Sequence, residues 1–558
     1  MKSNYIRIFL IALIVVIFMS LMTHWEEMFA PKQPVKFYNS AETKQVEKQL
    51  NTNSFEHGNI PTDVTNQDFD NMNLKPITLD TTVFSNLQIS LLNGAIINEA
   101  LKDYHVSLTD KNPMLMLNNT AGSKYVAQSI ININGQPQNI IFVKDNLAKK
   151  NDQTILSLTA KTKGLEILRQ YIINDITYEI TLKQSVKNIS NVPLSVSFDN
   201  EITRQVNPES HSFSILDAHS YSFQGAGLSS SQHSFQKESF ADLAKSNGKV
   251  DVSTNKGWAA MIHHYFVSLW VPNNPGESFN VYANKLVNNI YQSGVKTHPI
   301  VLNINQSVKN TNILYTGPTI TKNLEAIVKD FGTNKPDGLD KLVDYGMLSF
   351  ISVIIFWLMT LIHSIVANWG LSIILVTVLI KLLFYPLSAK SYKSMARMRM
   401  LQPRMKKLQE LFKGDRQKLG RKMIEMYKEE KVNPASGCLP VLIQIPVFIA
   451  LYWVLLESVQ LRQAPFIFWI HDLASKDPYF TLPILMGISM FVQQKISPPS
   501  GDPTQAKIMM LMPVLFTVFF LSFPSGLVLY WLTNNVISIG QQWYITKKYT
   551  ALYKLKRA

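Results

Sequence analysis

One lysine interrupts a long apolar stretch in the C-terminal half of the chain. Lys381 lies within residues 371–388, which contain no other charged side chain. An ammonium in the hydrocarbon of a bilayer costs about 2.5–3.5 kcal/mol even on lenient insertion scales, so such residues usually face a hydrated cavity or a partner. If the stretch spans a membrane, Lys381 marks a working surface whose chemistry is electrostatic. The alternative is that its long side chain snorkels to the nearby interface.

Polar side chains accompany Lys381 in the apolar part of the chain. Thr377 precedes it by four residues, on the same face of a helix. The other apolar stretches carry Gln444, Gln493, Gln494, Tyr530, Trp531, Thr533, Asn534 and Asn535. Such groups can line one hydrated pocket, or each can simply form interhelical hydrogen bonds. None of these stretches contains Asp or Glu, which argues against an internal ion pair or a carboxylate proton relay.

Composition indicates an integral membrane protein with a soluble part. The chain has 558 residues, of which 46% are hydrophobic and 17% charged, with a net charge of +15. One apolar stretch follows Lys2 and Arg7 near the N-terminus and predicts an uncleaved anchor. Six more lie at 347–366, 370–388, 438–456, 479–496, 507–523 and 526–545. Cys438 is the single cysteine, so no disulfide or cysteine-based metal site can form within one chain.

Two basic segments set the predicted topology. Residues 389–432 and the C-terminal tail are rich in Lys and Arg, which favours a cytoplasmic location for both. With the N-terminus also inside, an odd number of crossings must lie between residues 345 and 389. We predict that 370–388 crosses and that 347–366 lies along the outer interface; the reverse assignment, or one long tilted helix, fits the same count. Six crossings result, with both termini in the cytoplasm.

The basic segment 389–432 is predicted to form a helical hairpin. Apolar residues recur at spacings of three and four until Gly414-Asp415 breaks the pattern. Its basic face could hold it near anionic lipids. It could equally dock a ribosome, a targeting factor or a nascent chain, with methionines supplying adaptable contacts. The candidate docking residues are Arg397, Arg399, Arg404, Lys406, Lys407, Met398 and Met405.

The region between the anchor and residue 340 predicts a large antiparallel β-sandwich outside the membrane. Alternating apolar and polar residues mark strands at 154–160, 178–183 and 192–198, and residues 130–143 predict a hairpin with a Gly/Pro turn. Adjacent His263 and His264 are interpreted as packing or surface residues rather than metal ligands. No P-loop, nucleophile elbow, zinc-protease or dinucleotide-binding motif is present, so we predict no enzymatic activity and no cofactor.

The sequence therefore predicts a multi-pass α-helical membrane protein with six transmembrane helices, a large external all-β super-sandwich and a cytoplasmic helical hairpin. The predicted divisions are an anchor at 1–24, a flexible tether at 25–60, the β-sandwich at 61–340, an interfacial amphipathic helix at 341–368, a five-helix core with its hairpin at 369–545, and a basic tail at 546–558.

The C-terminal half resembles the YidC/Oxa/Alb family of membrane protein insertases, in its bacterial, Gram-negative form with a large periplasmic domain. The resemblance covers about 340–550 and also 257–272. The matching motifs are Asn368–Gly370, Tyr385–Leu387, Ser394–Pro403, Glu430–Pro434, Gly437–Pro440, Leu442–Gln444 with Pro446, Leu461–Pro465, Trp469–Leu473, Pro483–Gly487 and Phe523–Tyr530.

This resemblance implies a membrane protein insertase and chaperone of the inner membrane, which works alone or with the Sec translocon and its accessory subunits. It implies a hydrophilic groove, open to the cytoplasm and the lipid, whose positive charge receives the polar segment of a nascent membrane protein. Lys381 stands where relatives usually carry an arginine, which keeps the charge but loses the planar fork. Residues implied on the client path are Thr377, Lys381, Gln444, Ile445, Pro446, Tyr530 and Trp531.

Two other functions fit parts of the pattern. A solute or proton-coupled transporter would need charge pairs within the spans, which the sequence lacks. A membrane-anchored periplasmic binding or sensor protein would leave the basic hairpin and five further crossings without a purpose. The resemblance also implies a galactose-mutarotase-like sandwich for the external domain, without its sugar chemistry.

Overall fold

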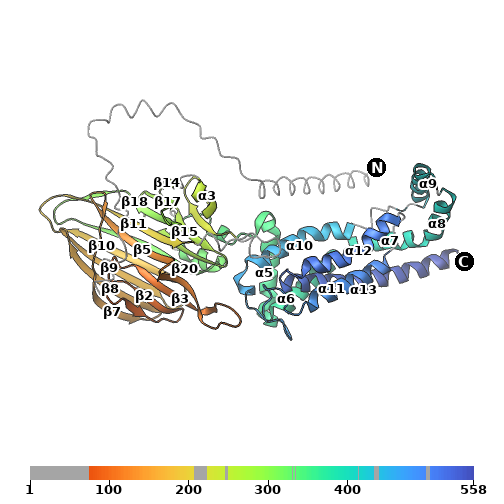
Figure 1. Ribbon diagram of the computed structural model, residues 1–558, viewed down its shortest axis with the longest axis horizontal. Helices are drawn as coiled ribbons and strands as arrows, with labels where there is room; N and C mark the ends of the chain where they lie inside the picture. The colour runs from red at the N-terminus through yellow and green to blue at the C-terminus, as the bar shows by residue number, and fades with distance from the viewer. Residues whose placement is uncertain are drawn as a thin grey trace, which may run out of the picture. The chain divides into compact units, whose positions relative to one another are not determined.

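The computed structural model describes residues 74–557, apart from 207–222, 246–248, 330, 333–334, 413, 431, 433–438 and 498–502 (Figure 1). The predicted anchor at 1–24 and tether at 25–60 lie outside these residues. Strands occupy the first part of the described chain, from Ile77 to Pro318, and long helices occupy the part from Ser349 to Arg557. This change from strands to helices follows the predicted change in composition.

The strands form two antiparallel sheets. The first follows the order β1 (Ile77–Leu79), β2 (Phe84–Ile89), β3 (Ile96–His105), β4 (Pro113–Thr120), β5 (Ser123–Ile133), β11 (Leu194–Gln205), β18 (Ile290–Thr297), β17 (Phe279–Lys285) and β14 (Lys249–Thr254), with β6 (Gln136–Pro137) on β5 and β19 (Ile300–Leu302) on β11. The second follows the order β13 (Gln236–Ser239), β12 (Gly225–Ser229), β15 (Trp258–His263), β16 (Phe266–Pro272), β20 (Ser307–Pro318), β10 (Glu179–Asn188), β9 (Leu165–Asn174), β8 (Gln153–Thr162) and β7 (Val143–Lys150).

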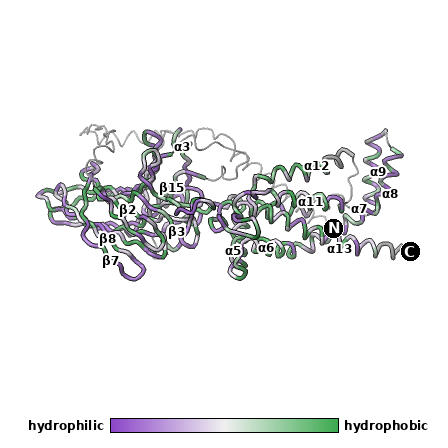
Figure 2. The backbone as a smooth tube through the Cα atoms, turned by 60° about the horizontal axis from the view of Figure 1, so that its bottom comes forward, coloured by the Kyte–Doolittle hydropathy of each residue, from purple (hydrophilic) through white to green (hydrophobic). Residues whose placement is uncertain are grey.

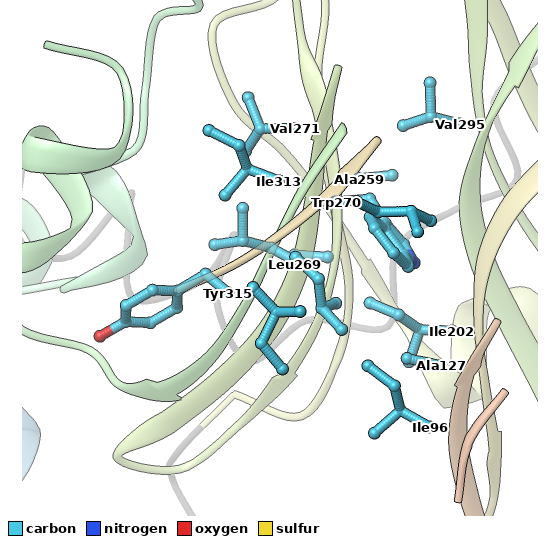
Figure 3. Close-up of a cluster of buried hydrophobic side chains, with 14 of the residues drawn as sticks. Ile96, Ala127, Ile202, Ala259, Leu269, Trp270, Val271, Val295, Ile313 and Tyr315 are labelled. Atoms are coloured by element: carbon cyan, nitrogen blue, oxygen red, sulfur yellow. The ribbon is translucent and has the colours of Figure 1, made fainter. Parts of the chain in front are cut away.

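The core of the sandwich lies between the two sheets. Trp270 of β16 points toward the sheet that carries Ala127 and Ile202 (Figure 3), and its indole Nε1 donates to Glu201 O at 3.2 Å. Trp270 is only 1% exposed. Alternation along the strands produces this core, because every second side chain points inward, and each large apolar side chain buried there contributes about 1.5–3 kcal/mol.

The predicted hairpin at 130–143 is only partly correct. A tight turn at Asn134-Gly135, where both residues have positive φ (49° and 78°), reverses β5 into β6, but β6 has just two residues. The chain then leaves this sheet and continues as β7, which pairs with β8 in the other sheet. The turn chemistry was visible in the sequence, whereas the partner of the returning strand depended on packing between the sheets.

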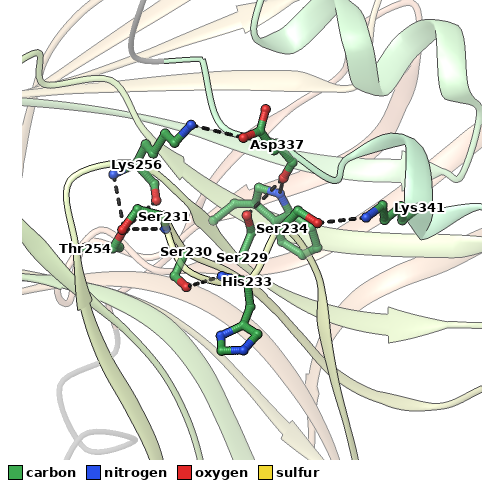
Figure 4. A network of polar contacts seen from close by, with 10 residues as sticks. Ser229, Ser230, Ser231, His233, Ser234, Thr254, Lys256, Asp337 and Lys341 are labelled. Atoms are coloured by element: carbon green, nitrogen blue, oxygen red, sulfur yellow. Dashed lines mark hydrogen bonds and ion pairs between the residues drawn. The ribbon is translucent and has the colours of Figure 1, made fainter.

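The segment between the sandwich and the helices is held against the sandwich by polar contacts (Figure 4). Lys256 forms an ion pair with Asp337 at 3.0 Å, and the Ser229 hydroxyl donates to the Asp337 carbonyl at 2.9 Å. Lys341 donates to the Ser234 hydroxyl at 2.7 Å. These contacts fix the path of the chain just before the first long helix.

Nine helices of six or more residues follow residue 345 within the described chain: α5 (Ser349–Val366), α6 (Trp369–Leu383), α7 (Tyr385–Met400), α8 (Gln402–Leu411), α9 (Arg416–Glu429), α10 (Leu439–Glu457), α11 (Thr481–Ile496), α12 (Pro503–Phe520) and α13 (Ser525–Arg557). Shorter helical segments are α3 (Phe240–Lys245), α4 (Thr321–Ile327), η5 (Asp340–Leu342), η6 (Gly346–Leu348) and η8 (Val459–Leu461). Hydrophobic residues dominate α5, α6 and α12, whereas hydrophilic residues recur along α8 and α9 (Figure 2).

The break predicted at residues 368–370 separates α5 from α6. Ala367 adopts a left-handed conformation (φ 51°), and the Asn368 side chain caps α6 by accepting from Leu371 N at 2.9 Å. By length and composition, Gly346–Val366 could cross a bilayer. Its outward residues are mostly apolar, including Val353, Ile354 and Trp357.

The apolar stretch 370–388 does not form one continuous helix as predicted. α6 ends at Leu383, and α7 begins at Tyr385 after a bend of 69°. Pro386 in the first turn of α7 explains the break, since proline lacks an N–H and its ring clashes with the carbonyl four residues earlier, which would belong to α6. α7 continues to Met400, so the first part of the predicted hairpin belongs to this bent element, and α8 and α9 form the two arms that pack together.

The last helix is longer than its apolar stretch. α13 continues without a break from Ser525 to Arg557, through the predicted boundary at 545. Thirty-three residues correspond to about 50 Å, which exceeds the roughly 30 Å of a hydrocarbon core. The basic tail is therefore presented on a rigid helix rather than as a separate segment.

Candidate functional site

Lys381 is buried among the helices and contacts a neutral hydroxyl. Its side chain is 3% exposed, and Nζ donates to Ser538 Oγ on α13 at 2.6 Å. Ser538 in turn donates to Asn534 O at 2.7 Å. Among the described residues, Lys381 has no ion pair. A buried ammonium can make three hydrogen bonds, so one neutral partner leaves much of its capacity unused.

A polar network connects this lysine to other helices through α13. Asn534 Nδ2 donates to Gln444 Oε1 on α10 at 3.1 Å. Asn535 Nδ2 donates to Ser489 Oγ on α11 at 2.9 Å. Gln444, Asn534 and Asn535, three of the amides singled out in the sequence, thus form interhelical hydrogen bonds, and Gln444 and Asn534 extend the network that begins at Lys381.

Thr377 occupies the same face of α6 as Lys381, as its spacing predicted. It is 1% exposed, and its hydroxyl donates to Ile373 O, one turn earlier, at 2.6 Å. The hydroxyl is therefore satisfied within its own helix. Thr377 contributes a small, enclosed surface next to the lysine rather than a free polar group.

The remaining residues of the implied client path occupy different surroundings. Trp531 packs edge-to-face on Phe448 of α10, with ring centroids 4.7 Å apart. Tyr530 is buried and Ile445 is 40% exposed. Pro446 lies inside α10. The structure therefore joins Lys381 and Gln444 in one polar network, whereas Trp531 belongs to an aromatic cluster and Ile445 faces outward.

The predicted docking residues divide into an exposed basic set and packed methionines. Arg397, Arg399, Arg404, Lys406 and Lys407 are all exposed. Met398 is half-buried. Met405 is 7% exposed and accepts a hydrogen bond from Tyr427 Oη at 3.8 Å, so it packs between α8 and α9. Arg404 pairs with Glu430 at 2.6 Å, which also ties the two arms together.

The sandwich contains its own buried ionisable groups. Burial raises the pKa of Glu99 to about 8, and one of its oxygens accepts a hydrogen bond from Thr316. Burial, with a contribution from Asp199, raises the pKa of Glu201 to about 7. No group of three or more His, Cys, Asp or Glu with metal-binding geometry occurs in the described part of the chain.

Comparisons with known proteins match both halves of the chain. The family model described as "60Kd inner membrane protein" matches residues 361–552, and the model for the YidC periplasmic domain matches residues 76–358. The membrane protein insertase YidC of Francisella philomiragia is 53% identical over 563 residues, which cover 99% of this chain and all of the relative. The chain belongs to the YidC family of membrane protein insertases.

Further relatives agree with this assignment. YidC of Francisella tularensis subsp. novicida is 52% identical over 567 residues, covering 99% of this chain and all of that protein. Among solved structures, an active YidC insertase with its first transmembrane domain resolved is 17% identical and has a TM-score of 0.36, over 84% of this chain and 93% of that chain. Family membership rests on the sequence matches.

Sequence reasoning missed two polar residues of this YidC-family site. Ser538 was overlooked because a serine in an apolar helix gives a weak signal, although it follows Asn534 by one helical turn. Tyr392 was assigned to the hairpin, yet it is 3% exposed and hydrogen-bonded to Ser538. Ser538 could be found from the sequence because it follows Asn534 by one helical turn. Tyr392 could not, because only the bend between α6 and α7 brings its side chain back to the surroundings of Lys381.

Proposed function

We propose that this protein inserts and folds integral membrane proteins in the bacterial inner membrane, acting as both insertase and chaperone. Identity above 50% with named YidC insertases over nearly the full chain supports this proposal. Its action is mechanical and electrostatic rather than enzymatic. It works alone on small clients and together with the Sec translocon on larger ones.

The observation that carries the mechanism is the buried ammonium of Lys381 with its neutral partner Ser538. A carboxylate adds the attraction of its negative charge to a hydrogen bond with an ammonium, which a neutral hydroxyl cannot do. An acidic or polar client segment that reaches Lys381 therefore displaces the serine hydroxyl with a gain in free energy. That gain offsets part of the cost of moving the client segment out of water.

The client path runs along a hydrophilic groove that opens to the cytoplasm and the lipid. Lys381, Thr377 and Gln444 line its polar side, and Ile445, Pro446, Tyr530 and Trp531 contact the apolar part of the client. Lys381 and Thr377 are enclosed by neighbouring helices, and in this proposal the groove is closed at their level until a client enters. Client entry requires the helices around α13 to separate at this level.

The proposed topology has six crossings, with both termini in the cytoplasm and the sandwich in the periplasm. The exposed basic residues on α8 and α9 support a cytoplasmic hairpin, as do Lys547 and Lys548 on the exposed end of α13. The mostly apolar exterior of α5 is compatible with either a crossing or an interfacial position, and we retain the interfacial assignment because it preserves the parity of the crossings.

The proposed partners follow from these surfaces. Nascent membrane proteins are the clients, and the Sec translocon with its accessory subunits shares the larger ones. The exposed basic residues of α7 and α8 suit ribosomal RNA, the targeting machinery or anionic lipids, because each presents a dense negative charge. The buried position of Met405 indicates that such docking is mainly electrostatic.

Photocrosslinking tests the client path. A photoreactive residue placed at 377, 445 or 531 is exposed to ribosome-bound nascent chains of a small membrane protein, with position 350 on the exposed face of α5 as the matched control. We expect labelling at the three path positions. Labelling at 377 also reports that the helices around α13 have separated, since Thr377 is 1% exposed in the closed form. Equal labelling at 350 and at all three path positions would overturn the path.

A second test concerns the charge. In cells depleted of the native insertase, Lys381→Glu is expected to impair insertion of clients with acidic external tails, whereas Lys381→Arg is expected to be tolerated. Normal insertion of acidic-tailed clients by Lys381→Glu would refute the role of the charge without affecting family membership.

A further inference from the structure

Three helices meet at the hydroxyl group of Ser538 on α13. Lys381 Nζ on α6 donates to it at 2.6 Å, and the phenol of Tyr392 on α7 is hydrogen-bonded to the same side chain. The Ser538 hydroxyl donates its own proton to Asn534 O at 2.7 Å. A serine hydroxyl has one proton and two lone pairs, so Ser538 can accept from Lys381 while its own proton is donated to Asn534 O.

The two partners of Ser538 lie on opposite sides of the bend in the chain. Lys381 precedes the break at Phe384 and Tyr392 follows it, and the two helices meet at 69°. Ser538 is 2% exposed, and both partners are 3% exposed. One buried hydroxyl therefore ties both arms of the α6–α7 element to α13.

A second contact joins α7 to α13 nearer their exposed ends. Arg397 Nη2 donates to Tyr549 Oη at 3.3 Å, and Lys393 Nζ lies 5.6 Å from the centre of the Tyr549 ring. These side chains are exposed or half-buried, so the contact is weaker than the one at Ser538. α8 continues directly from α7, which means that movement of the α8–α9 hairpin reaches Ser538 through α7.

We propose that Ser538 is a positioning residue that fixes where the Lys381 ammonium meets an acidic client segment and, through Tyr392, couples that position to α7. The proposal rests on the proposed function, because it deepens the role assigned to Lys381. When a client carboxylate takes the ammonium, Ser538 loses the hydrogen bond that Lys381 donates to it. Lys381 on α6 is then released from α13 while Tyr392 still joins α7 to Ser538, so client capture frees one arm of the bent element relative to the other.

The first experiment measures charge preference with the full-length protein in proteoliposomes. The clients are single-spanning model proteins whose translocated tails carry zero to three acidic residues, and insertion is followed by protease protection. We expect Ser538→Ala to reduce the preference for acidic over neutral tails about fivefold, equivalent to about 1 kcal/mol. Ser538→Thr keeps the hydroxyl and is expected to retain the preference within about twofold.

Ser489→Ala is the matched control, because it removes another buried interhelical hydroxyl, bonded to Asn535, without touching Lys381. It is expected to leave the preference unchanged. Tyr392→Phe removes the other hydrogen bond to Ser538 and is expected to lower the preference about twofold, since Lys381 keeps its partner. This second variant keeps the test valid if Ser538→Ala does not fold.

The second experiment measures the coupling without any client. Cysteines replace Lys393 and Tyr549 in a Cys438→Ser background, and a short bismaleimide joins them. The two cysteines remove the exposed contact of Tyr549 with Lys393 and Arg397. The crosslinking yield then reports how closely the hydrogen bonds at Ser538 hold α7 to α13. Ser538→Ala is expected to lower the yield at least twofold, and Ser538→Thr is expected to restore it.

The outcomes distinguish the positioning role of Ser538 from the proposed role of the Lys381 charge. If Lys381→Met abolishes the acidic preference but Ser538→Ala keeps both the preference and the crosslinking yield of the parent, the positioning role is refuted and the proposed function stands. If Lys381→Met itself keeps the preference, the proposed role of the charge fails, and the positioning role fails with it. Equal losses in Ser538→Ala and Ser489→Ala would reduce Ser538 to a packing residue.

Discussion

The sandwich and the helical region each bury a basic side chain, and they surround it differently. Arg169 on β9 is fully buried, and its guanidinium donates to Ser129 O at 2.9 Å, to Gln184 Oε1 at 2.6 Å and to Asn93 O. It also lies over the Phe142 ring, 4.6 Å from the centroid. Several fixed partners share its charge.

Lys381 on α6 is almost as deeply buried, yet Ser538 is its one hydrogen-bond partner among the described residues. A buried charge is destabilising unless its partners compensate for the lost water. The sandwich supplies most of that compensation, with Nε the one nitrogen of the Arg169 guanidinium that has no hydrogen-bond partner, and gains a fixed structure. The helical region leaves it incomplete, which leaves the ammonium available to an incoming group. Arg169 is thus a buried charge that stabilises the fold, whereas Lys381 is a buried charge that can bind a client.

The largest predicted effect is on the sandwich. Arg169→Met leaves the carbonyls of Ser129 and Asn93 and the side chain of Gln184 without their donor, so unfolding should become easier by about 3 kcal/mol or more. Thermal unfolding of the full-length protein, followed by the β-sheet circular dichroism signal, checks this. Lys161→Met, at an exposed position, is the control and should change little. A small effect of Arg169→Met would remove the contrast with Lys381.

The second prediction is that Lys381→Met lowers activity without lowering stability. Lys381→Met removes an incompletely paired buried charge, so thermal stability should stay within a few degrees or rise. Insertion of a client with an acidic tail should fall about tenfold, equivalent to about 1.4 kcal/mol. Protease protection in proteoliposomes and thermal unfolding in detergent measure the two effects, with Lys381→Arg as the control. A stability loss as large as that of Arg169→Met would show that Lys381 is structural.

The third prediction uses the pH dependence of the sandwich. Because the pKa of Glu99 is raised to about 8 in the fold, the folded state holds a proton that the unfolded state has released above about pH 4.5. Stability should therefore fall as pH rises from about 5 to 8, by on the order of 1 kcal/mol per unit from this group.

Glu99→Gln keeps a neutral side chain that can bond Thr316, so it should reduce this slope and leave the part that comes from Glu201, whose pKa is also raised. Urea unfolding at a series of pH values, monitored by the same β-sheet signal, measures the slope. Glu166→Gln, on an exposed part of β9, should leave it unchanged. An identical slope in Glu99→Gln and the parent would contradict the assignment to Glu99.

The smallest predicted effect concerns a neutral pair in the helical region. Gln444 and Asn534 share one hydrogen bond at 3.1 Å, and such interhelical bonds are worth about 0.6 kcal/mol on average. A double-mutant cycle with Gln444→Leu and Asn534→Leu, measured by unfolding in mixed micelles, should give a coupling of about this size. A coupling above about 2 kcal/mol would mean that neutral polar pairs also fix the fold here.

Much of the fold was predictable because its local signals are strong. Helices occur at the predicted apolar stretches from 438 onward, with α10, α11, α12 and the start of α13 close to the expected bounds. The two-layer β-sandwich was predictable from alternating strands. The bend after Leu383 was harder to predict, since Pro386 signalled a local break but the angle depends on what the two arms pack against.

The candidate site was predictable only in part. Lys381 and Thr377 were identified because a charge and a hydroxyl stand out in an apolar helix, and their shared face follows from helical spacing. Gln444 was identified as a polar residue, but its bond to Asn534 requires α10 and α13 to lie side by side. Ser538 and Tyr392 were missed, because serine and tyrosine are common in helices and gain meaning only from what they contact.

The sequence by itself determined the class of the protein, the division into strands and helices, the family and the position of the anomalous charge. These follow from composition, periodicity and local chemistry, which act over a few residues. Tertiary structure alone decided that the ammonium of Lys381 is enclosed, and that its partner is a single hydroxyl shared with Tyr392 across a bend. The physical reason is that partners separated by 157 residues, as Lys381 and Ser538 are, meet only when whole helices pack.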